Sequence, residues 1–244
     1  YQGQDIKSID IKVNDDQAIE NNLIYGSVKG LKIDRETQKV IKGATFGLFK
    51  SDITEFTENN AILTAVTDES GVFVFNNIPY GEYLINELKP ADGYLDNEDV
   101  FTVTIKDNEQ VIEITAINDK VPELKTTATV NDKKEAVAKG EITIKDTVEY
   151  KHLVPNTEYV IKGTLMDKST GKPFKVKGKE ITSTVKFVPD KADGKVEVTF
   201  TFDGSAIKKD TELVVFETLY RDGVELTAHA DINDDGQTVT IKVP

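Results

Sequence analysis

The residues best suited to chemistry gather near the end of the chain, in the stretch HADINDDGQT at residues 229–238, which holds one of only two histidines. This stretch matches the start of a calcium-binding loop of the type that lies between two helices, at Asp231, Asn233, Asp235 and Gly236. The twelfth position of such a loop needs a bidentate glutamate, but here it is Lys242 within a strand-like run. We therefore expect no metal site, although the motif leaves open whether residues 231–235 hold a cation.

Three carboxyl side chains fall on apolar faces of strand-like runs. Side chains of a strand alternate between its two faces, so residues two apart share a face. By this parity Asp146 lies with Ile142, Ile144, Val148 and Tyr150, Glu217 lies with Leu213, Val215 and Leu219, and Glu87 lies with Tyr83 and Ile85. A buried carboxylate is costly without a partner, so these positions predict polar sites inside the core.

The same parity separates three candidate threonine nucleophiles. Thr126 shares a face with Leu124, Ala128 and Val130. Thr127 and Thr129 share the opposite face with Lys125 and Asn131. We therefore expect Thr126 to point inward.

Strand parity also bears on the orientation of a lysine and an asparagine. Asn118 shares parity with the apolar residues Ile112, Ile114 and Ala116, which predicts an inward side chain. Lys32 is undecided, because Val28 lies on its face while Leu31 and Ile33 lie on the other.

The composition limits the classes of function. The 244 residues include no cysteine, so disulfides and thiol chemistry are excluded, and their number allows two domains. With 43 acidic against 30 basic residues, the net charge of -13 disfavours nucleic acids and anionic membranes as partners. The sequence shows no signal peptide and no anchoring tail, so we expect a segment of a longer protein.

Alternating runs between Gly, Asn, Asp and Pro residues predict an all-β chain of two tandem immunoglobulin-like β-sandwiches. The best boundary is NDKVPELK at residues 118–125, which gives domains at 24–120 and 121–244. Residues 1–23 resemble the end of the first domain, with a tyrosine, a strand, a hairpin rich in Asn and Asp, and an asparagine. We interpret them as the tail of a preceding domain, with an added edge strand of the first domain as the alternative.

Residues 24–120 resemble a collagen-adhesin B-type domain, also called SpaA-like, of Gram-positive surface adhesins and pilins. The resemblance rests on ordered motifs: GSVKGLKID, KGATFGL, IPYGEY, NELKPADGY and a last strand that ends in asparagine. In that family a first-strand lysine and a last-strand asparagine form an isopeptide bond with help from a buried acid, which implies Lys32, Asn118 and Glu87. Burial would favour the neutral amine as nucleophile, and a protonated carboxyl could donate a hydrogen bond to the carboxamide oxygen.

Residues 122–244 resemble a threonine–glutamine ester-bond domain, or VaFE repeat, through LKTTATV, EITIKDTVEY, VVFE and HADINDDGQTV. The resemblance implies that Thr126 attacks the side-chain amide of Gln237 and that His229 is the base. Asp146 and Glu217 would then be the acid partners, and the sequence does not say which contacts the imidazole and which holds the amide. His152 lies near a turn and is interpreted as a surface residue.

These resemblances imply a mechanically hardened stalk segment of a cell-wall-anchored surface adhesin or pilus-like fibre, monomeric and without a cofactor. Its expected partners are neighbouring domains of the same adhesin, with any host ligand bound through a head domain outside this segment. No turnover enzyme is expected, because the product would stay attached to the nucleophile. The main alternative is an adhesive module that binds a host ligand through loops such as residues 50–64.

Overall fold

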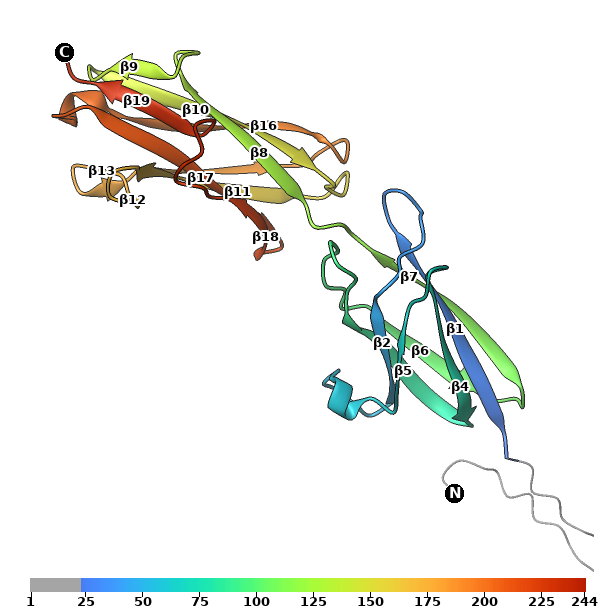
Figure 1. The fold of residues 1–244 in the computed structure, drawn as a ribbon. Helices are drawn as coiled ribbons and strands as arrows, with labels where there is room; N and C mark the ends of the chain where they lie inside the picture. The colour runs from blue at the N-terminus through green and yellow to red at the C-terminus, as the bar shows by residue number, and fades with distance from the viewer. Residues whose placement is uncertain (1–22) are drawn as a thin grey trace, which may run out of the picture. The chain divides into compact units, whose positions relative to one another are not determined.

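A computed structural model of the chain describes residues 23–244, which form two compact units that divide between Lys120 and Val121 (Figure 1). Strands dominate both units, and the only helices among the described residues are two 3-10 turns, at Glu58–Asn60 and Gly204–Ala206. The prediction of an all-β chain of sandwich domains is therefore confirmed. Within the described part, no helix has the length and apolar character needed to cross a membrane. The expected tail of a preceding domain lies, apart from Leu23, outside the described residues.

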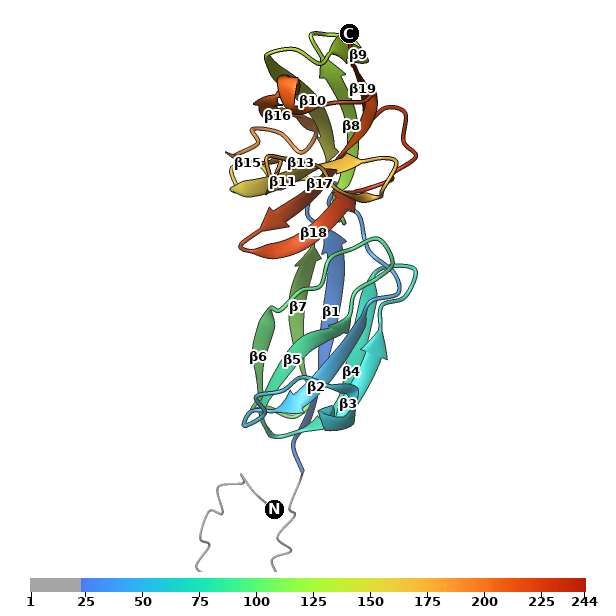
Figure 2. The same ribbon diagram turned by 90° about the vertical axis from the view of Figure 1, so that its left-hand side faces the viewer.

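The first unit packs two antiparallel-rich sheets, with strand orders β4-β1-β7 and β3-β2-β5-β6, around one apolar core. The first and last strands, β1 and β7, lie side by side and run parallel (Figure 2). The strands are β1 (Tyr25–Asp34), β2 (Thr45–Lys50), β3 (Leu63–Val66), β4 (Val72–Pro79), β5 (Gly81–Lys89), β6 (Val100–Ile105) and β7 (Gln110–Asn118).

Strand β1 alternates between inward and outward side chains, and its even-numbered residues point into the core. A glycine at position 30 is required, because a Cβ atom there would lie 2.0 Å from the ring of Phe73. That ring instead stacks on Phe46 with 4.0 Å between the centroids. The glycine therefore leaves room for the ring of its partner on β4 in the same sheet, and that ring packs against the facing sheet.

The second unit also contains two main sheets. One has the order β16-β10-β8 and the other β12-β11-β17-β19-β9, with β15 added on β11 and β18 on β17. The strands are β8 (Glu123–Val130), β9 (Glu135–Val137), β10 (Glu141–Lys151), β11 (Tyr159–Asp167), β12 (Lys172–Pro173), β13 (Lys175–Val176), β14 (Lys179–Glu180), β15 (Thr182–Phe187), β16 (Gly194–Asp203), β17 (Thr211–Arg221), β18 (Val224–His229) and β19 (Thr238–Lys242).

The first and last strands of the second unit lie in different sheets. Strand β8 pairs with β10, whereas β19 pairs with β17 and with β9. A backbone hydrogen bond from Ala128 N to Gly236 O, at 2.9 Å, joins β8 to the segment just before β19. The two units therefore bring their first and last strands together in different ways.

Candidate functional site

The first unit buries an amine, a carboxamide and a carboxyl group in one place. Lys32 lies on β1 and is 0% exposed, and Asn118 at the end of β7 is 2% exposed. Glu87 lies on β5 in the facing sheet and reaches across the core. The face of Lys32, which its own strand pattern left undecided, is therefore the inward one.

These three side chains contact one another directly. Lys32 Nζ donates to Asn118 Oδ1 at 2.7 Å and lies 3.0 Å from Glu87 Oε1. Asn118 Nδ2 donates to the other oxygen, Glu87 Oε2, at 2.8 Å. The carboxylate thus bridges the amine and the carboxamide nitrogen, and the amine lies against the carboxamide oxygen.

The contact of Glu87 differs from the expected one. We expected its carboxyl to donate to the carboxamide oxygen, but it accepts from the nitrogen. The reason is the ion pair with Lys32, since an ionised carboxylate can only accept hydrogen bonds. Burial lowers the pKa of Lys32, while the attraction of Glu87 opposes that shift. The amine is therefore poised to lose a proton to its neighbour.

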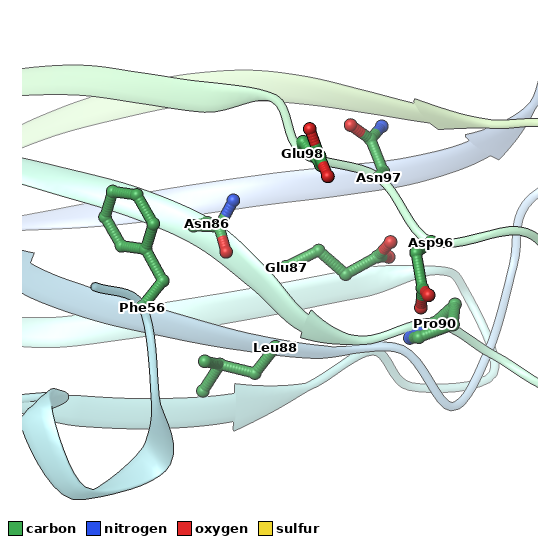
Figure 3. A pocket seen from close by; sticks show the side chains of 8 residues that line it. All are labelled: Phe56, Asn86, Glu87, Leu88, Pro90, Asp96, Asn97 and Glu98. Carbon is green, nitrogen blue, oxygen red and sulfur yellow. The ribbon is translucent and has the colours of Figure 1, made fainter. Parts of the chain in front are cut away.

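A cavity of about 580 Å³ adjoins Glu87 (Figure 3). The segment Asp96–Glu98 and the side chain of Asn86 line it together with Phe56, Leu88 and Pro90. Asn97 Nδ2 donates to Ile117 O at 2.7 Å, so this segment is fastened to the residue next to Asn118. Asn118 Nδ2 also donates to Leu95 O at 3.1 Å. The carboxamide nitrogen of Asn118 is thus bound to the segment that borders this cavity.

The second unit also brings its predicted site residues to one place. Thr126 on β8 is 2% exposed and faces inward as its parity predicted, whereas Thr127 is exposed. Asp146, Glu217 and Gln237 are each 0% exposed. His229 ends β18, directly opposite Glu217 on β17.

The imidazole of His229 connects the threonine to an acid. Thr126 Oγ1 lies 3.1 Å from His229 Nδ1. His229 Nε2 lies 3.2 Å from Asp234 Oδ2, in the acidic turn. A proton on Nε2, facing that carboxylate, leaves Nδ1 free to accept the proton of the hydroxyl.

Asp146 and Glu217 form a second acidic group, which lies beside Thr126 and does not share in the ion pair of the imidazole with Asp234. Burial raises the pKa of Asp146, and burial together with the Asp146 carboxyl raises the pKa of Glu217 to about 11. Two adjacent carboxyl groups in a core cannot both ionise cheaply, so the pair holds a proton at neutral pH.

Glu217 also contacts the amide of Gln237. Gln237 Nε2 donates to Glu217 Oε2 at 3.2 Å and to His229 O at 3.3 Å. Within residues 23–244, Gln237 Oε1 has no hydrogen-bond partner. Glu217 thus orients the carboxamide through its nitrogen.

Asp234 was not among the predicted site residues. The sequence pattern does not single it out, because three aspartates within five positions give no sign of which one meets the imidazole. The structure also shows that backbone groups occupy carboxylates of this turn: Asp231 Oδ1 accepts from Asn233 N at 2.9 Å, and Asp234 Oδ1 accepts from Gly236 N at 2.6 Å. The turn is thus stabilised by its own hydrogen bonds.

Comparisons with known proteins agree with this division of the chain. Residues 26–120 match the family model described as SpaA, a prealbumin-like fold domain, and residues 122–241 match the T-Q ester bond containing domain. A collagen adhesin of Staphylococcus aureus is 26% identical over 140 residues, which are 57% of this chain and 12% of that adhesin. The chain thus spans about an eighth of that curated relative.

Solved structures resemble the chain at low identity. BcpA, the major pilin subunit of Bacillus cereus, gives a TM-score of 0.54 at 16% identity, over 89% of this chain and 69% of that one. A bacterial adhesin from Mobiluncus mulieris, described as containing intramolecular disulfide, isopeptide and ester bond cross-links, gives 0.45 at 20% identity, over 51% of this chain and 58% of that one. At 16% identity, the likeness to BcpA shows the fold alone.

Proposed function

Because the chain joins a SpaA-type prealbumin-like domain to a T-Q ester bond domain, we propose that it is a mechanically hardened stalk segment of a Gram-positive surface adhesin or pilus-like fibre, anchored to the cell wall. The hardening comes from two bonds that the chain makes within itself, an isopeptide between Lys32 and Asn118 and an ester between Thr126 and Gln237. One observation carries the proposal: Lys32 Nζ, Glu87 and the Asn118 carboxamide form a closed, buried set of contacts.

The isopeptide reaction begins with proton transfer from the Lys32 ammonium to Glu87, which turns a buried ion pair into two neutral groups. The neutral amine attacks the side-chain carbonyl carbon of Asn118, and a carbon–nitrogen bond forms. Glu87 delivers its proton to the Asn118 nitrogen and takes one from the attacking nitrogen, so the old carbon–nitrogen bond breaks. One ammonia leaves, and an amide remains.

The ester reaction begins at the imidazole of His229, which takes the proton of the Thr126 hydroxyl. The Thr126 oxygen attacks the side-chain carbonyl carbon of Gln237. A carbon–oxygen bond forms, and the bond between that carbon and Gln237 Nε2 breaks. The imidazolium returns its proton to the departing nitrogen, so one ammonia leaves. Asp234 stabilises the charged imidazole, and Glu217 holds the carboxamide in place.

Both bonds join the beginning of a domain to its end, which suits a segment pulled from its two ends. Force would enter at the first strand and leave at the last, so a covalent bridge there bypasses the hydrogen bonds of the sheets. Closing loops of about 87 and about 112 residues would also stabilise each domain by roughly 4–5 kcal/mol, if the chain-entropy argument for disulfides applies. Neither bond needs an oxidant, which suits a chain without cysteine.

The intact mass of the purified chain tests the proposal. We expect a mass lower than the sequence mass by two ammonia molecules, and crosslinked Lys32–Asn118 and Thr126–Gln237 peptides in digests. A mass equal to the sequence mass would show that neither bond forms. The loss of one ammonia would show that only one domain forms its bond.

A second candidate function is adhesive binding of a host ligand by the first domain. A hollow of about 850 Å³ borders the loop of residues 50–64 and is also lined by Tyr80 and Tyr83. Aromatic and polar side chains around a hollow are typical of ligand sites. Binding of the immobilised chain to glycan and extracellular-matrix arrays, lost on Tyr80→Ala, would support this function, and no binding above a Tyr80→Ala control would remove it.

A further inference from the structure

Lys134 makes an unusual set of contacts in the second unit. It lies between β8 and β9, and its ammonium donates to two backbone carbonyls, Ala128 O at 2.7 Å and Gly236 O at 2.6 Å. Its own carbonyl accepts from Thr240 N on β19 at 2.8 Å. Lys134 therefore contacts β8 and the residue before Gln237 through its side chain, and it contacts β19 through its backbone.

The two carbonyls flank the proposed reacting residues. Ala128 is two positions after Thr126 on β8, and Gly236 directly precedes Gln237. Strands β8 and β19 belong to different sheets, so no ladder of hydrogen bonds fixes their register. The contacts that join these two segments converge on Gly236 O, which accepts from Ala128 N and from Lys134 Nζ.

The charge of Lys134 also fits its surroundings. Asp146, Asp234 and Asp235 all attract its ammonium, and the first two belong to the two acidic groups of the site. Charge-assisted hydrogen bonds to carbonyls are stronger than neutral ones. A cation here therefore holds the two segments together and offsets part of the negative charge of the site.

We propose that Lys134 is a positioning residue for the ester bond: it sets the distance between Thr126 and Gln237 by clamping Ala128 to Gly236. This inference rests on the proposed ester reaction. Within residues 23–244, the Lys134 ammonium donates to backbone carbonyls and to neither the hydroxyl nor the carboxamide, so it acts through the backbone and not on the reacting atoms.

The experiment follows the loss of the second ammonia by intact mass at timed intervals after cell-free synthesis of the whole chain. Lys134→Met should slow that loss at least about tenfold, because one charge-assisted clamp is removed. Lys134→Arg, which keeps the charge and several donors, should recover part of the rate. Lys133→Met is the matched control, since the hydrogen bonds of Lys133 with Val130 are made by its backbone, and it should react like the parent.

A second measurement distinguishes an effect on the reaction from an effect on folding alone. The same substitutions are made in the Thr126→Ala chain, where no ester can form, and thermal unfolding is measured. A clamp that acts on the reaction gives a slow Lys134→Met chain that is folded at the temperature of the assay. If that chain links at the parent rate, the inference is overturned and the ester proposal stands. If the parent forms no ester, both fail. Should Lys134→Met not fold, Lys134→Gln decides between slow and parental linkage.

Discussion

Lys32 Nζ lies 2.7 Å from Asn118 Oδ1, although 86 positions separate the two residues in the sequence. Parallel pairing of β1 with β7 creates this contact, because it sets Asp34 opposite Asn118 and so leaves Lys32 one inward position away. The carboxyl that completes the site comes from the other sheet.

Glu87→Ala should give a folded first domain without the isopeptide, because no group is left to move protons between the amine and the departing nitrogen. Thermal unfolding should occur at a lower temperature, with a loss of roughly 4–5 kcal/mol from the open loop. Glu82→Ala, an exposed position on the same strand, is the control. A Lys32–Asn118 peptide in digests of the Glu87→Ala chain would show that the assigned role is wrong.

Thr126→Ala should abolish the ester, while Thr127→Ala and Thr129→Ala should still lose the second ammonia. The reason is orientation, since only Thr126 of the three is buried beside the imidazole. Intact mass distinguishes the variants directly. An ester that persists in the Thr126 chain and vanishes in the Thr127 chain would overturn the choice of nucleophile.

Hydroxylamine should distinguish the two bonds chemically. An ester carbonyl reacts readily with a strong nucleophile, whereas an amide resists it, so treatment under denaturing conditions should cut Thr126–Gln237 and spare Lys32–Asn118. Peptide mapping before and after treatment measures both. A second-domain crosslink that survives the treatment would not be an ester.

Asp234→Asn should slow ester formation at least about tenfold, because the imidazole loses the anion that fixes its tautomer and stabilises its charged form. Asp235→Asn is the control, since its side chain is 99% exposed and forms an ion pair with Lys168. Timed intact masses give the rates. Equal rates in the two variants would remove Asp234 from the site.

Glu217 should make the unlinked second domain less stable as the pH rises. Its folded pKa of about 11 exceeds that of an unfolded glutamate, so the folded state holds a proton that the unfolded state releases. The free energy of unfolding of Thr126→Ala should therefore fall steadily as the pH rises above the range in which a free glutamate titrates. Urea denaturation should show this slope reduced in Thr126→Ala with Glu217→Gln, and parallel curves would contradict it.

Strand parity alone predicted the inward orientation of several site residues. Thr126, Asp146 and Glu217 lie on faces whose other members are apolar, so the period of two identifies them. Lys32 could not be placed in this way, because Leu31 and Ile33 on the outer face are apolar as well and remain half-buried in the structure.

Contacts across the core were beyond the reach of the sequence pattern. Asp146 and Glu217 belong to facing sheets, and the period of a strand says nothing about which residues of two sheets meet. Asp234 is a comparable case, since the fold of a short turn, and not a repeating pattern, brings its carboxylate to His229. The contact of the Glu87 carboxyl with the carboxamide nitrogen, in place of the expected contact with its oxygen, likewise depends on the ion pair with Lys32, which is a tertiary contact.

The parallel pairing of β1 with β7 also determines how much chain the first domain could release under tension. Tyr25 and Asn118 lie at opposite ends of that strand pair, so a pull on the chain shears the two strands along their length. If Lys32 and Asn118 are bonded, the 85 residues between them leave the load path. Fully extended, they would measure about 290 Å. A fibre of such domains would then keep its length under tension, because its domains could not lengthen by unfolding.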